Sequence, residues 1–297
     1  MIIPEKLKKG NKIGIISTAR KVSKVDLEPA IKLLNSWGLE VVLSENLFNE
    51  DNQFSGTESQ RAADLQEMIN DKSIKAIFCA RGGYGTVQII DNINFSVLTS
   101  NPKWIIGYSD VTVLHSHLHT LGISSLHATM PINFTENTAE SLDSLRKCLF
   151  QDHYTIQCNP HEFNIHGKVE SEIIGGNLSI LYSLLGSDSD IITDGKILFI
   201  EDLDEYLYHI DRMIINLKRN GKFDKLSGLI VGGMQKMHDN TISYGKKAEE
   251  IIYSYLEDCD FPICFSFPSG HIDDNRSIKF GVKSILKIDE NGVNLSQ

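Results

Sequence analysis

The sequence predicts an α/β fold in which an open parallel sheet occupies the first half of the chain and a second domain follows. Between residues 12 and about 130, short apolar runs alternate with segments whose apolar residues recur at helical spacing. Residues 135–165 are more polar, and strand patterns resume beyond them. We therefore divide the chain into a first domain of residues 1–134, a linker of residues 135–165 and a second domain of residues 166–297.

The first domain has the strand and helix pattern of a doubly wound sheet. Ser23 and Asp26 form a capping-box pattern before a helix that ends at Gly38. Right-handed crossovers would wrap such helices over the sheet. The expected strands are 12–17, 39–43, 74–80, 104–106 and 123–128, and the expected helices are 27–37, 57–71, 86–90 and 111–121.

The linker and the second domain combine helices with further strands. The linker contains one amphipathic helix through residues 142–149, and Asn291-Gly292 is typical of a hairpin turn between the last strands. Other helices are expected directly after 175–177, at 206–217 and at 251–256, and other strands at 196–200, 226–234 and 262–267.

The composition favours a soluble cytoplasmic protein with a small-molecule partner. A net charge of -10 and a pI near 5.5 argue against nucleic acid or an anionic membrane surface as partner. No apolar run approaches the roughly 20 residues of a membrane helix, and the first residues lack the pattern of an export signal. The five cysteines are scattered and odd in number, which favours reduced thiols.

Four polar clusters each follow the carboxyl end of an expected strand, which is where open α/β sheets bind their ligands. Their common position indicates one site built from distant parts of the sequence. The clusters are Arg81-Gly82-Gly83-Tyr84-Gly85, Gly107-Tyr108-Ser109-Asp110, Glu201-Asp202-Leu203-Asp204-Glu205 and Pro268-Ser269-Gly270-His271.

Ser109 stands on the turn between an expected strand and an expected helix, and two interpretations are compatible. It can cap the helix, a role that serine often fills. It can also be a nucleophile at the sheet edge, with helix amides behind it that bind an oxyanion.

Gly82 and Gly83 either form a plain tight turn or let a backbone amide approach a ligand oxygen. Their segment lacks the glycine spacing of a dinucleotide-binding loop.

Glu201 and His271 are the groups that a serine nucleophile needs as partners. Glu201 directly follows a buried strand and is expected to point inward, whereas Asp202, Asp204 and Glu205 are expected in a solvated loop. His271 is either structural or a general base. The order Ser, Glu, His is that of α/β-hydrolases, but the second glycine of their G-x-S-x-G motif is missing here.

His115, His117 and His119 resemble a metal cluster in their spacing. On a helix, His115 and His119 share a face, whereas His117 does not. The glutamate that follows the first histidine in the zincin motif is absent, so we expect no metal at this place.

Six spaced motifs resemble those of the LD-carboxypeptidase family of serine peptidases. The resemblance covers about 12 to 288 and implies a Rossmann-like N-terminal domain, a smaller β-rich α+β C-terminal domain and a homodimer. The motifs are RGGYG (81–85), GYSD.T (107–112), GGNL (175–178), LFIED (198–202), YHIDRM (208–213) and FPSGH..DN (267–275).

The same resemblance implies a role for individual residues. Ser109 would be the nucleophile, His271 the general base and Glu201 the acid that orients the base. The backbone amides of Asp110 and Gly83 would form the oxyanion hole. Such a serine mechanism uses no cofactor and no metal. The residues expected to contact the substrate are Arg81, Gly82, Gly176 and Asn177; Arg81 is expected to bind the terminal carboxylate, because arginine binds carboxylates bidentately.

Three functions remain open from the sequence. The family's best-known members remove the terminal D-alanine from murein tetrapeptides in cell-wall recycling, and a sister branch inactivates peptidyl-nucleotide antibiotics of the microcin C type. The third possibility is a peptide-binding protein without catalysis. The only tryptophans, Trp37 and Trp104, are expected in the core of the first domain, which disfavours a stacked nucleotide base and favours a muropeptide substrate.

Overall fold

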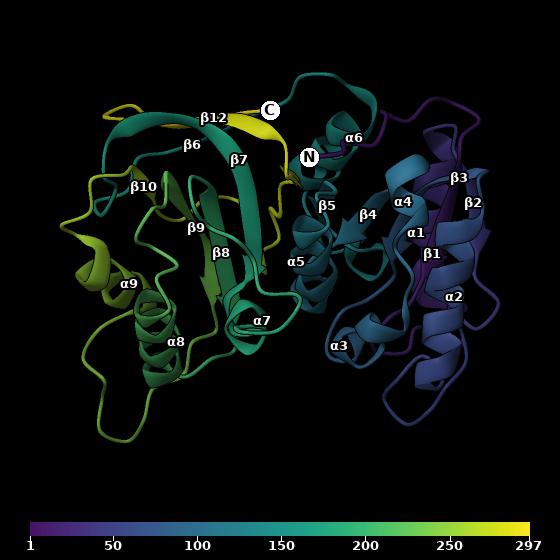
Figure 1. The fold of residues 1–297 in the computed structure, drawn as a ribbon, viewed down its shortest axis with the longest axis horizontal. Helices are drawn as coiled ribbons and strands as arrows, with labels where there is room; N and C mark the ends of the chain where they lie inside the picture. The colour runs from purple at the N-terminus through teal and green to yellow at the C-terminus, as the bar shows by residue number, and fades with distance from the viewer.

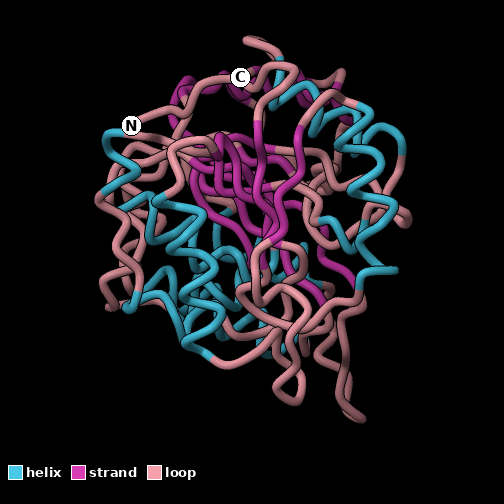
Figure 2. Tube along the Cα trace, turned by 90° about the vertical axis from the view of Figure 1, so that its right-hand side faces the viewer, coloured by secondary structure: helices cyan, strands magenta, loops and turns pink.

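Two β-sheets organise the chain, and each takes its strands mainly from one half of the sequence (Figure 1). The computed structural model describes residues 1–297. The strands lie in the middle of the molecule, and helices and loops surround them (Figure 2). The predicted α/β fold class, with an open parallel sheet first and a second sheet after it, is confirmed.

The first sheet has six strands in the order β11-β5-β4-β3-β1-β2. All neighbouring strands run parallel except β11, which adds to β5 as an antiparallel edge strand. Five of the strands lie where the sequence predicts them. They are β1 (Lys12–Ile16), β2 (Glu40–Leu43), β3 (Ile74–Cys79), β4 (Trp104–Gly107) and β5 (Ser125–His127), and the sixth is β11 (Ile278–Phe280).

Helices cover both faces of the first sheet, as right-handed crossovers require. Helices α1 (Lys24–Ser36) and α6 (Ala139–Phe150) bury their apolar side chains on one face. The other face is covered by α2 (Glu58–Asn70), α3 (Thr86–Ile89), α4 (Val97–Ser100) and α5 (Thr112–Thr120). Helix α1 begins with the predicted capping box, in which Ser23 and Asp26 each accept a hydrogen bond from the other's backbone amide. Short 3-10 segments occur at Ile90–Asn92, Ser109–Val111 and Pro131–Asn133.

The second sheet has seven strands in the order β10-β9-β8-β7-β12-β13-β6. Its strands from β10 to β7 run parallel, and those from β7 to β6 run antiparallel. Helices α7 (Leu178–Ser183), α8 (Leu207–Arg219) and α9 (Ala248–Leu256) pack on the parallel part. The strands are β6 (Thr155–Cys158), β7 (Gly167–Asn177), β8 (Ile197–Leu203), β9 (Gly228–Gln235), β10 (Ile263–Cys264), β12 (Lys283–Asp289) and β13 (Gly292–Ser296).

Two strands do not belong to the sheet of their neighbours in sequence. Strand β6 lies inside the predicted linker and forms the edge of the second sheet, and β11 lies inside the predicted second domain but pairs with the first sheet. Ile278 and Phe280 of β11 are buried in a core cluster that contains residues from both halves of the chain. This cluster therefore joins the two halves, and the chain has two further core clusters.

The junction between the two sheets is formed by α5 of the first half and by β7 and α7 of the second, which pack together (Figure 1). The carboxyl ends of β4 and β8 both reach this junction, so the turns that follow these strands can meet there. None of the helices combines the length and the apolar character that spanning a membrane requires. All five cysteines are free thiols.

Candidate active site

Ser109 lies directly after the buried strand β4, on the predicted turn between strand and helix. Its φ of 63° is in the left-handed region, which a non-glycine residue adopts only where the surrounding structure enforces it. The preceding Tyr108 has extended backbone, and a 3-10 segment begins at Ser109 itself. This sharp turn directs the Ser109 hydroxyl out of the sheet edge and toward the second half of the chain.

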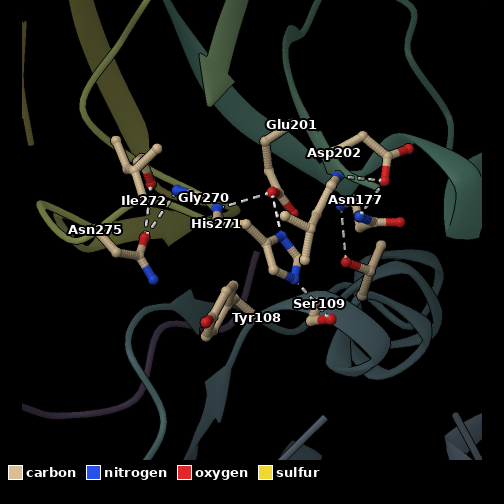
Figure 3. A network of polar contacts seen from close by, with 12 residues as sticks. Tyr108, Ser109, Asn177, Glu201, Asp202, Gly270, His271, Ile272 and Asn275 are labelled. Atoms are coloured by element: carbon tan, nitrogen blue, oxygen red, sulfur yellow. Dashed lines mark hydrogen bonds and ion pairs between the residues drawn. The ribbon is translucent and has the colours of Figure 1, made fainter. Parts of the chain in front are cut away.

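The three residues predicted as a triad meet at the junction (Figure 3). The Nε2 atom of His271 lies 3.0 Å from the Ser109 hydroxyl oxygen, although the two residues are 162 positions apart. The Nδ1 atom of His271 lies 2.6 Å from Oε2 of Glu201, which is completely buried. Oε2 of Glu201 also accepts a hydrogen bond of 3.0 Å from the backbone amide of His271. The carboxylate therefore holds both the ring and the main chain of the histidine.

Gly270 allows the His271 turn to come this close to Glu201. Its φ is +108°, and a Cβ at this position would lie 2.7 Å from both Cβ and Oε2 of Glu201. The Asn275 side chain accepts a hydrogen bond of 2.8 Å from the Gly270 amide, which closes the turn. The Tyr108 ring packs against the His271 ring with 4.8 Å between their centroids. The imidazole is thus held in place by the turn that carries it and by the Tyr108 ring that packs against it.

The segment Arg81-Gly82-Gly83 lies beside the serine. A Cβ on Gly82 would be 3.1 Å from Cβ of Ser109 and 3.3 Å from its hydroxyl oxygen, so the two turns are in van der Waals contact. The buried carboxylate of Asp110 accepts a hydrogen bond of 2.9 Å from the Thr86 amide and joins the turns further.

The buried Arg61 forms hydrogen bonds that hold the same glycine segment in place. Its Nη1 donates to the carbonyl oxygens of Thr18 at 2.7 Å and Gly85 at 2.9 Å, and its Nη2 donates to Gln88. Arg61 is 1% exposed, so these hydrogen bonds replace the water that its guanidinium loses. The sequence analysis missed this role, but the spacing of Arg61 with Leu65 and Met68 on one helix face was a readable signal for burial.

Asp202 corrects one expectation. The sequence predicts a solvated side chain, but Asp202 is 1% exposed, because β8 extends through Leu203 and is covered on both faces. Its carboxylate accepts hydrogen bonds of 2.9 Å from Nδ2 of Asn177 and from the Ser179 amide. The backbone amide of Asn177 in turn donates a hydrogen bond of 2.9 Å to the Thr112 hydroxyl. These contacts join β8 and β7 to α5, the helix behind the serine.

Gly176 and Asn177 lie on this structural network. A Cβ on Gly176 would lie 2.4 Å from the Thr112 hydroxyl oxygen, which explains the glycine at a φ of +142°. Neither residue lines the cavity beside Ser109. Their contact with substrate stays a prediction, while their position shows that they connect the two halves of the chain.

The charges around the histidine favour its protonated form. Burial lowers the pKa of His271, but the charge and hydrogen bond of Glu201 and the charge of Asp202 together outweigh it, so the pKa is raised. Burial, with the neighbouring charge of Glu201, raises the pKa of Asp202 to about 7. A positive imidazole is therefore stabilised here, and an imidazole must become positive when it takes a proton from a serine.

A cavity of about 540 Å³ opens beside Ser109 and His271. Gly82, Gly83 and Arg81 line it, as do several further charged and polar side chains. No Phe, Tyr or Trp ring lines this cavity, although Tyr108 borders an adjoining one of about 470 Å³ that shares His271. The space beside the hydroxyl is thus polar and large enough for a short peptide segment.

The histidines of α5 each have a separate partner. His115 is buried between the Ser125 hydroxyl and the Gly107 carbonyl, at 2.8 and 2.9 Å. His117 contacts the Ser189 hydroxyl at 3.0 Å, and the His119 ring lies 3.3 Å from the carbonyl oxygen of residue 192. No group of three or more His, Cys, Asp or Glu side chains in the chain is arranged to hold a metal ion. These histidines stabilise the packing of α5.

The geometry is that of an acyl-transfer site. A serine hydroxyl faces an imidazole, a buried carboxylate fixes the opposite ring nitrogen, and glycine-rich backbone lies beside the hydroxyl. Such an arrangement can deprotonate the serine as it attacks a carbonyl carbon and can bind the resulting oxyanion with backbone amides.

Comparison with known proteins identifies relatives over most of the chain. Residues 13–128 match the family model described as the LD-carboxypeptidase N-terminal domain, and residues 170–286 match that of the LD-carboxypeptidase C-terminal domain. A probable murein peptide carboxypeptidase of Bacillus subtilis is 35% identical over 97% of this chain and 92% of that protein. The microcin C7 self-immunity protein of Escherichia coli is 26% identical over 97% of this chain and 94% of that protein.

The fold is shared with solved structures as well. A muramoyltetrapeptide carboxypeptidase from Oxalobacter formigenes superimposes with a TM-score of 0.89 over 96% of this chain and 98% of that chain, at 24% sequence identity. At this level of identity, the similarity demonstrates a common architecture of both domains.

Proposed function

The chain belongs to the LD-carboxypeptidase family, and we propose that it is a serine-type L,D-carboxypeptidase that removes the terminal D-alanine from murein tetrapeptides in cell-wall recycling. The observation that carries this proposal is the contact chain from Ser109 through His271 to Glu201. A protein that only binds peptides needs no base within 3.0 Å of a strained serine and no buried acid behind that base. The geometry therefore favours catalysis over binding alone.

In the first half of the reaction, the Ser109 hydroxyl attacks the carbonyl carbon of the residue before D-alanine. Nε2 of His271 accepts the hydroxyl proton, and the Glu201 carboxylate stabilises the imidazolium through Nδ1. The backbone amides of Gly83 and Asp110 are proposed to donate to the oxyanion. The imidazolium then gives its proton to the amine of D-alanine, the carbon–nitrogen bond breaks, and an acyl-serine ester remains.

In the second half, water replaces D-alanine at the same place. His271 takes a proton from this water, which attacks the ester carbon, and then returns a proton to the Ser109 oxygen. The shortened peptide leaves with a new carboxylate. His271 thus acts twice as base and twice as acid, for which the hydrogen bond to Glu201 keeps its ring in one orientation.

The alternative substrate is a peptidyl-nucleotide antibiotic of the microcin C type, since one relative is a microcin C7 self-immunity protein. Binding of a nucleotide base usually requires an aromatic ring for stacking. Trp104 is buried and donates its indole N–H to a backbone carbonyl, and Trp37 packs on the core cluster. The aromatic residues of segment 129–174 also pack on core clusters; they are Phe134, Phe150, Tyr154 and Phe163. The absence of a Phe, Tyr or Trp ring in the lining of the 540 Å³ cavity supports the tetrapeptide substrate.

The resemblance to the family also supports two proposals about the protein in the cell. We propose that it works in the cytoplasm, where murein fragments are recycled, and that it forms a homodimer. Size-exclusion chromatography with light scattering tests the second proposal directly, because a monomer and a dimer of a 33.3 kDa chain differ twofold in mass.

The function is tested by incubating the protein with free tetrapeptide, L-Ala-γ-D-Glu-meso-diaminopimelyl-D-Ala, and detecting released D-alanine by mass spectrometry. We expect kcat/KM for this peptide to be at least about tenfold above that for an aspartyl-adenylate analogue, since the cavity has no Phe, Tyr or Trp ring for a stacking contact worth about 1–3 kcal/mol. The Ser109→Ala variant is the control for contaminating peptidases. The reverse ranking would assign the protein to the antibiotic-inactivating branch, and tight binding of the tetrapeptide without turnover would make it a binding protein.

A further inference from the structure

We propose that Arg20 binds the terminal carboxylate of the substrate and thereby makes the enzyme selective for a free carboxyl terminus. This inference rests on the proposed function, because it concerns the residue that leaves in the same reaction. Arg20 lies outside all the sequence motifs, and from the sequence alone Arg81 is the residue expected to bind this carboxylate.

Arg20 is held against the glycine segment beside the nucleophile. Its backbone amide donates to the Gly82 carbonyl at 3.4 Å, and its own carbonyl accepts a hydrogen bond of 2.8 Å from the Ser17 hydroxyl. The Cγ, Cδ and Nε atoms of its side chain lie 2.6–2.8 Å from the place where a Cβ on Gly83 would be. The Arg20 stem therefore lies on the α-carbon of Gly83, and glycine at position 83 makes room for it.

The guanidinium of Arg20 has no partner in the protein. It makes no ion pair and no hydrogen bond, although it lines the same cavity as Ser109 and His271. The neighbouring cation Lys21, by contrast, forms an ion pair of 2.6 Å with Glu50. An unpaired arginine in the wall of a polar cavity is available to an anion, and its planar fork fits a carboxylate in a bidentate way.

Arg81 lies in the same wall but is already engaged. Its Nη1 donates to the Lys21 carbonyl at 3.1 Å, and the side chain is half-buried. Its charge also acts on Asp26: hydrogen bonds from Ser23 lower the pKa of that carboxyl, and the Arg81 charge adds to the effect. The positive charge of Arg81 is therefore partly balanced by the exposed Asp26, whereas the Arg20 guanidinium has no ion pair.

The chemistry of the substrate places a carboxylate within reach of this cation. The leaving D-alanine carries its carboxylate on the carbon next to the scissile nitrogen. When Ser109 attacks the scissile carbonyl and the Gly83 amide binds the carbonyl oxygen, the D-alanine carboxylate would therefore lie close to the glycine segment. Because Arg20 covers Gly83, the guanidinium is placed to bind the carboxylate before and during the attack.

The test compares two peptides on the full-length enzyme: the tetrapeptide with a free terminal carboxylate and the same tetrapeptide with a terminal carboxamide. We expect the wild-type enzyme to prefer the carboxylate by at least about tenfold in kcat/KM, as expected for a hydrogen-bonded charge pair. In Arg20→Gln, KM for the carboxylate should rise about tenfold or more with little change in kcat, and the preference should fall to near one. Arg20→Lys should keep part of the preference, since it keeps the charge but loses the fork.

Two further variants complete the experiment. Lys21→Gln removes the same charge from the next position in the chain, outside the cavity lining, and should behave like the wild-type enzyme. Arg81→Gln should keep the preference for the carboxylate. If Arg20→Gln keeps the wild-type preference, the inference is overturned, and a loss confined to Arg81→Gln would transfer the role to Arg81. If the wild-type enzyme releases neither D-alanine from the carboxylate peptide nor D-alaninamide from the carboxamide peptide, the proposed function itself fails, and the inference falls with it.

Discussion

Replacing Glu201 by glutamine is expected to lower kcat about a thousandfold while the protein stays folded. Oε2 of Glu201 accepts hydrogen bonds from both Nδ1 and the backbone amide of His271, at 2.6 and 3.0 Å. The oxygen of a glutamine side chain can accept both of these bonds, so the turn that carries His271 should keep its place. What the substitution removes is the negative charge that balances the imidazolium in the transition state.

The size of the effect follows from the burial and the distance. The Glu201 side chain is fully buried, and the charge centres of a carboxylate and an imidazolium in such contact are about 4 Å apart. Two unit charges at this separation interact by about 4 kcal/mol at an effective dielectric constant of about 20. Since each 1.36 kcal/mol is a factor of ten in rate, about 4 kcal/mol corresponds to roughly three powers of ten in kcat.

The same substitution should change the pH dependence of the reaction. The pKa of His271 in the wild-type protein is raised, because the charge and hydrogen bond of Glu201, with the charge of Asp202, outweigh the effect of burial. Only the neutral imidazole can act as the base, so activity should be lost as the pH falls through this pKa. Without the carboxylate charge the pKa falls, and the acidic limb of kcat/KM should move to lower pH.

The assay is D-alanine release from the tetrapeptide over a series of pH values, with thermal unfolding as the check on folding. Glu205→Gln is the matched control, because Glu205 is an acid just beyond the same strand that pairs with His209 and not with the catalytic histidine. A Glu201→Gln variant with nearly wild-type kcat, or with an unmoved acidic limb, would refute the assignment of Glu201 as the orienting acid.

Three further substitutions and one control test the site and its support. Ser109→Ala should lower kcat about 10⁴-fold or more in the D-alanine assay with an unchanged melting temperature, and a smaller loss would remove Ser109 as nucleophile. Gly270→Ala should destabilise the protein by roughly 1–3 kcal/mol in urea unfolding and lower kcat, because its Cβ would lie 2.7 Å from Glu201 at a φ of +108°. Gly245→Ala, at a φ of +83° with no atom within 4 Å, should cost less and leave kcat intact; equal costs would show that the contact with Glu201 is unimportant. Burial raises the pKa of Asp202 from 3.8 to about 7, so this carboxyl makes the folded state lose stability as the pH rises from about 4 to about 7. Asp202→Asn should lack this part of the pH dependence in urea unfolding, and an identical pH dependence of the two proteins would mean that folding does not raise the pKa of this carboxyl.

Local patterns in the sequence were sufficient for the order and type of the elements in the first half. Apolar runs, helical spacing and the capping box of Ser23 and Asp26 act within a few residues of one another, so they can be interpreted without knowing the fold. The same local reasoning placed Ser109 correctly after β4, but Glu201 lies inside β8, and the two strands belong to different sheets. The family resemblance then suggested which of these polar residues act together.

The tertiary structure decided everything that depends on pairs of distant segments. Strand β11 joins the first sheet and β6 the second because each completes a sheet edge and a core surface that are built by other parts of the chain.

Asp202 is buried for the same kind of reason. Successive side chains of a strand point to opposite faces, so Glu201 faces His271 while Asp202 faces Asn177 and Ser179. Glu201 and Asp202 are neighbours within β8. The His271 turn covers one face of the strand and α7 covers the other, and only this packing shows that both acids are buried.

Arg20 is the clearest example of a residue whose role depends on contacts between distant segments. In the sequence it is one cation next to Lys21, and nothing in its local pattern distinguishes the two. The pairing of its backbone with Gly82 and the course of its side chain over Gly83 bring it to the nucleophile, while Lys21 turns to Glu50. The sequence by itself determined that the site is polar and where its elements begin; which charge faces the substrate depends on contacts across more than sixty residues, which only the folded chain creates.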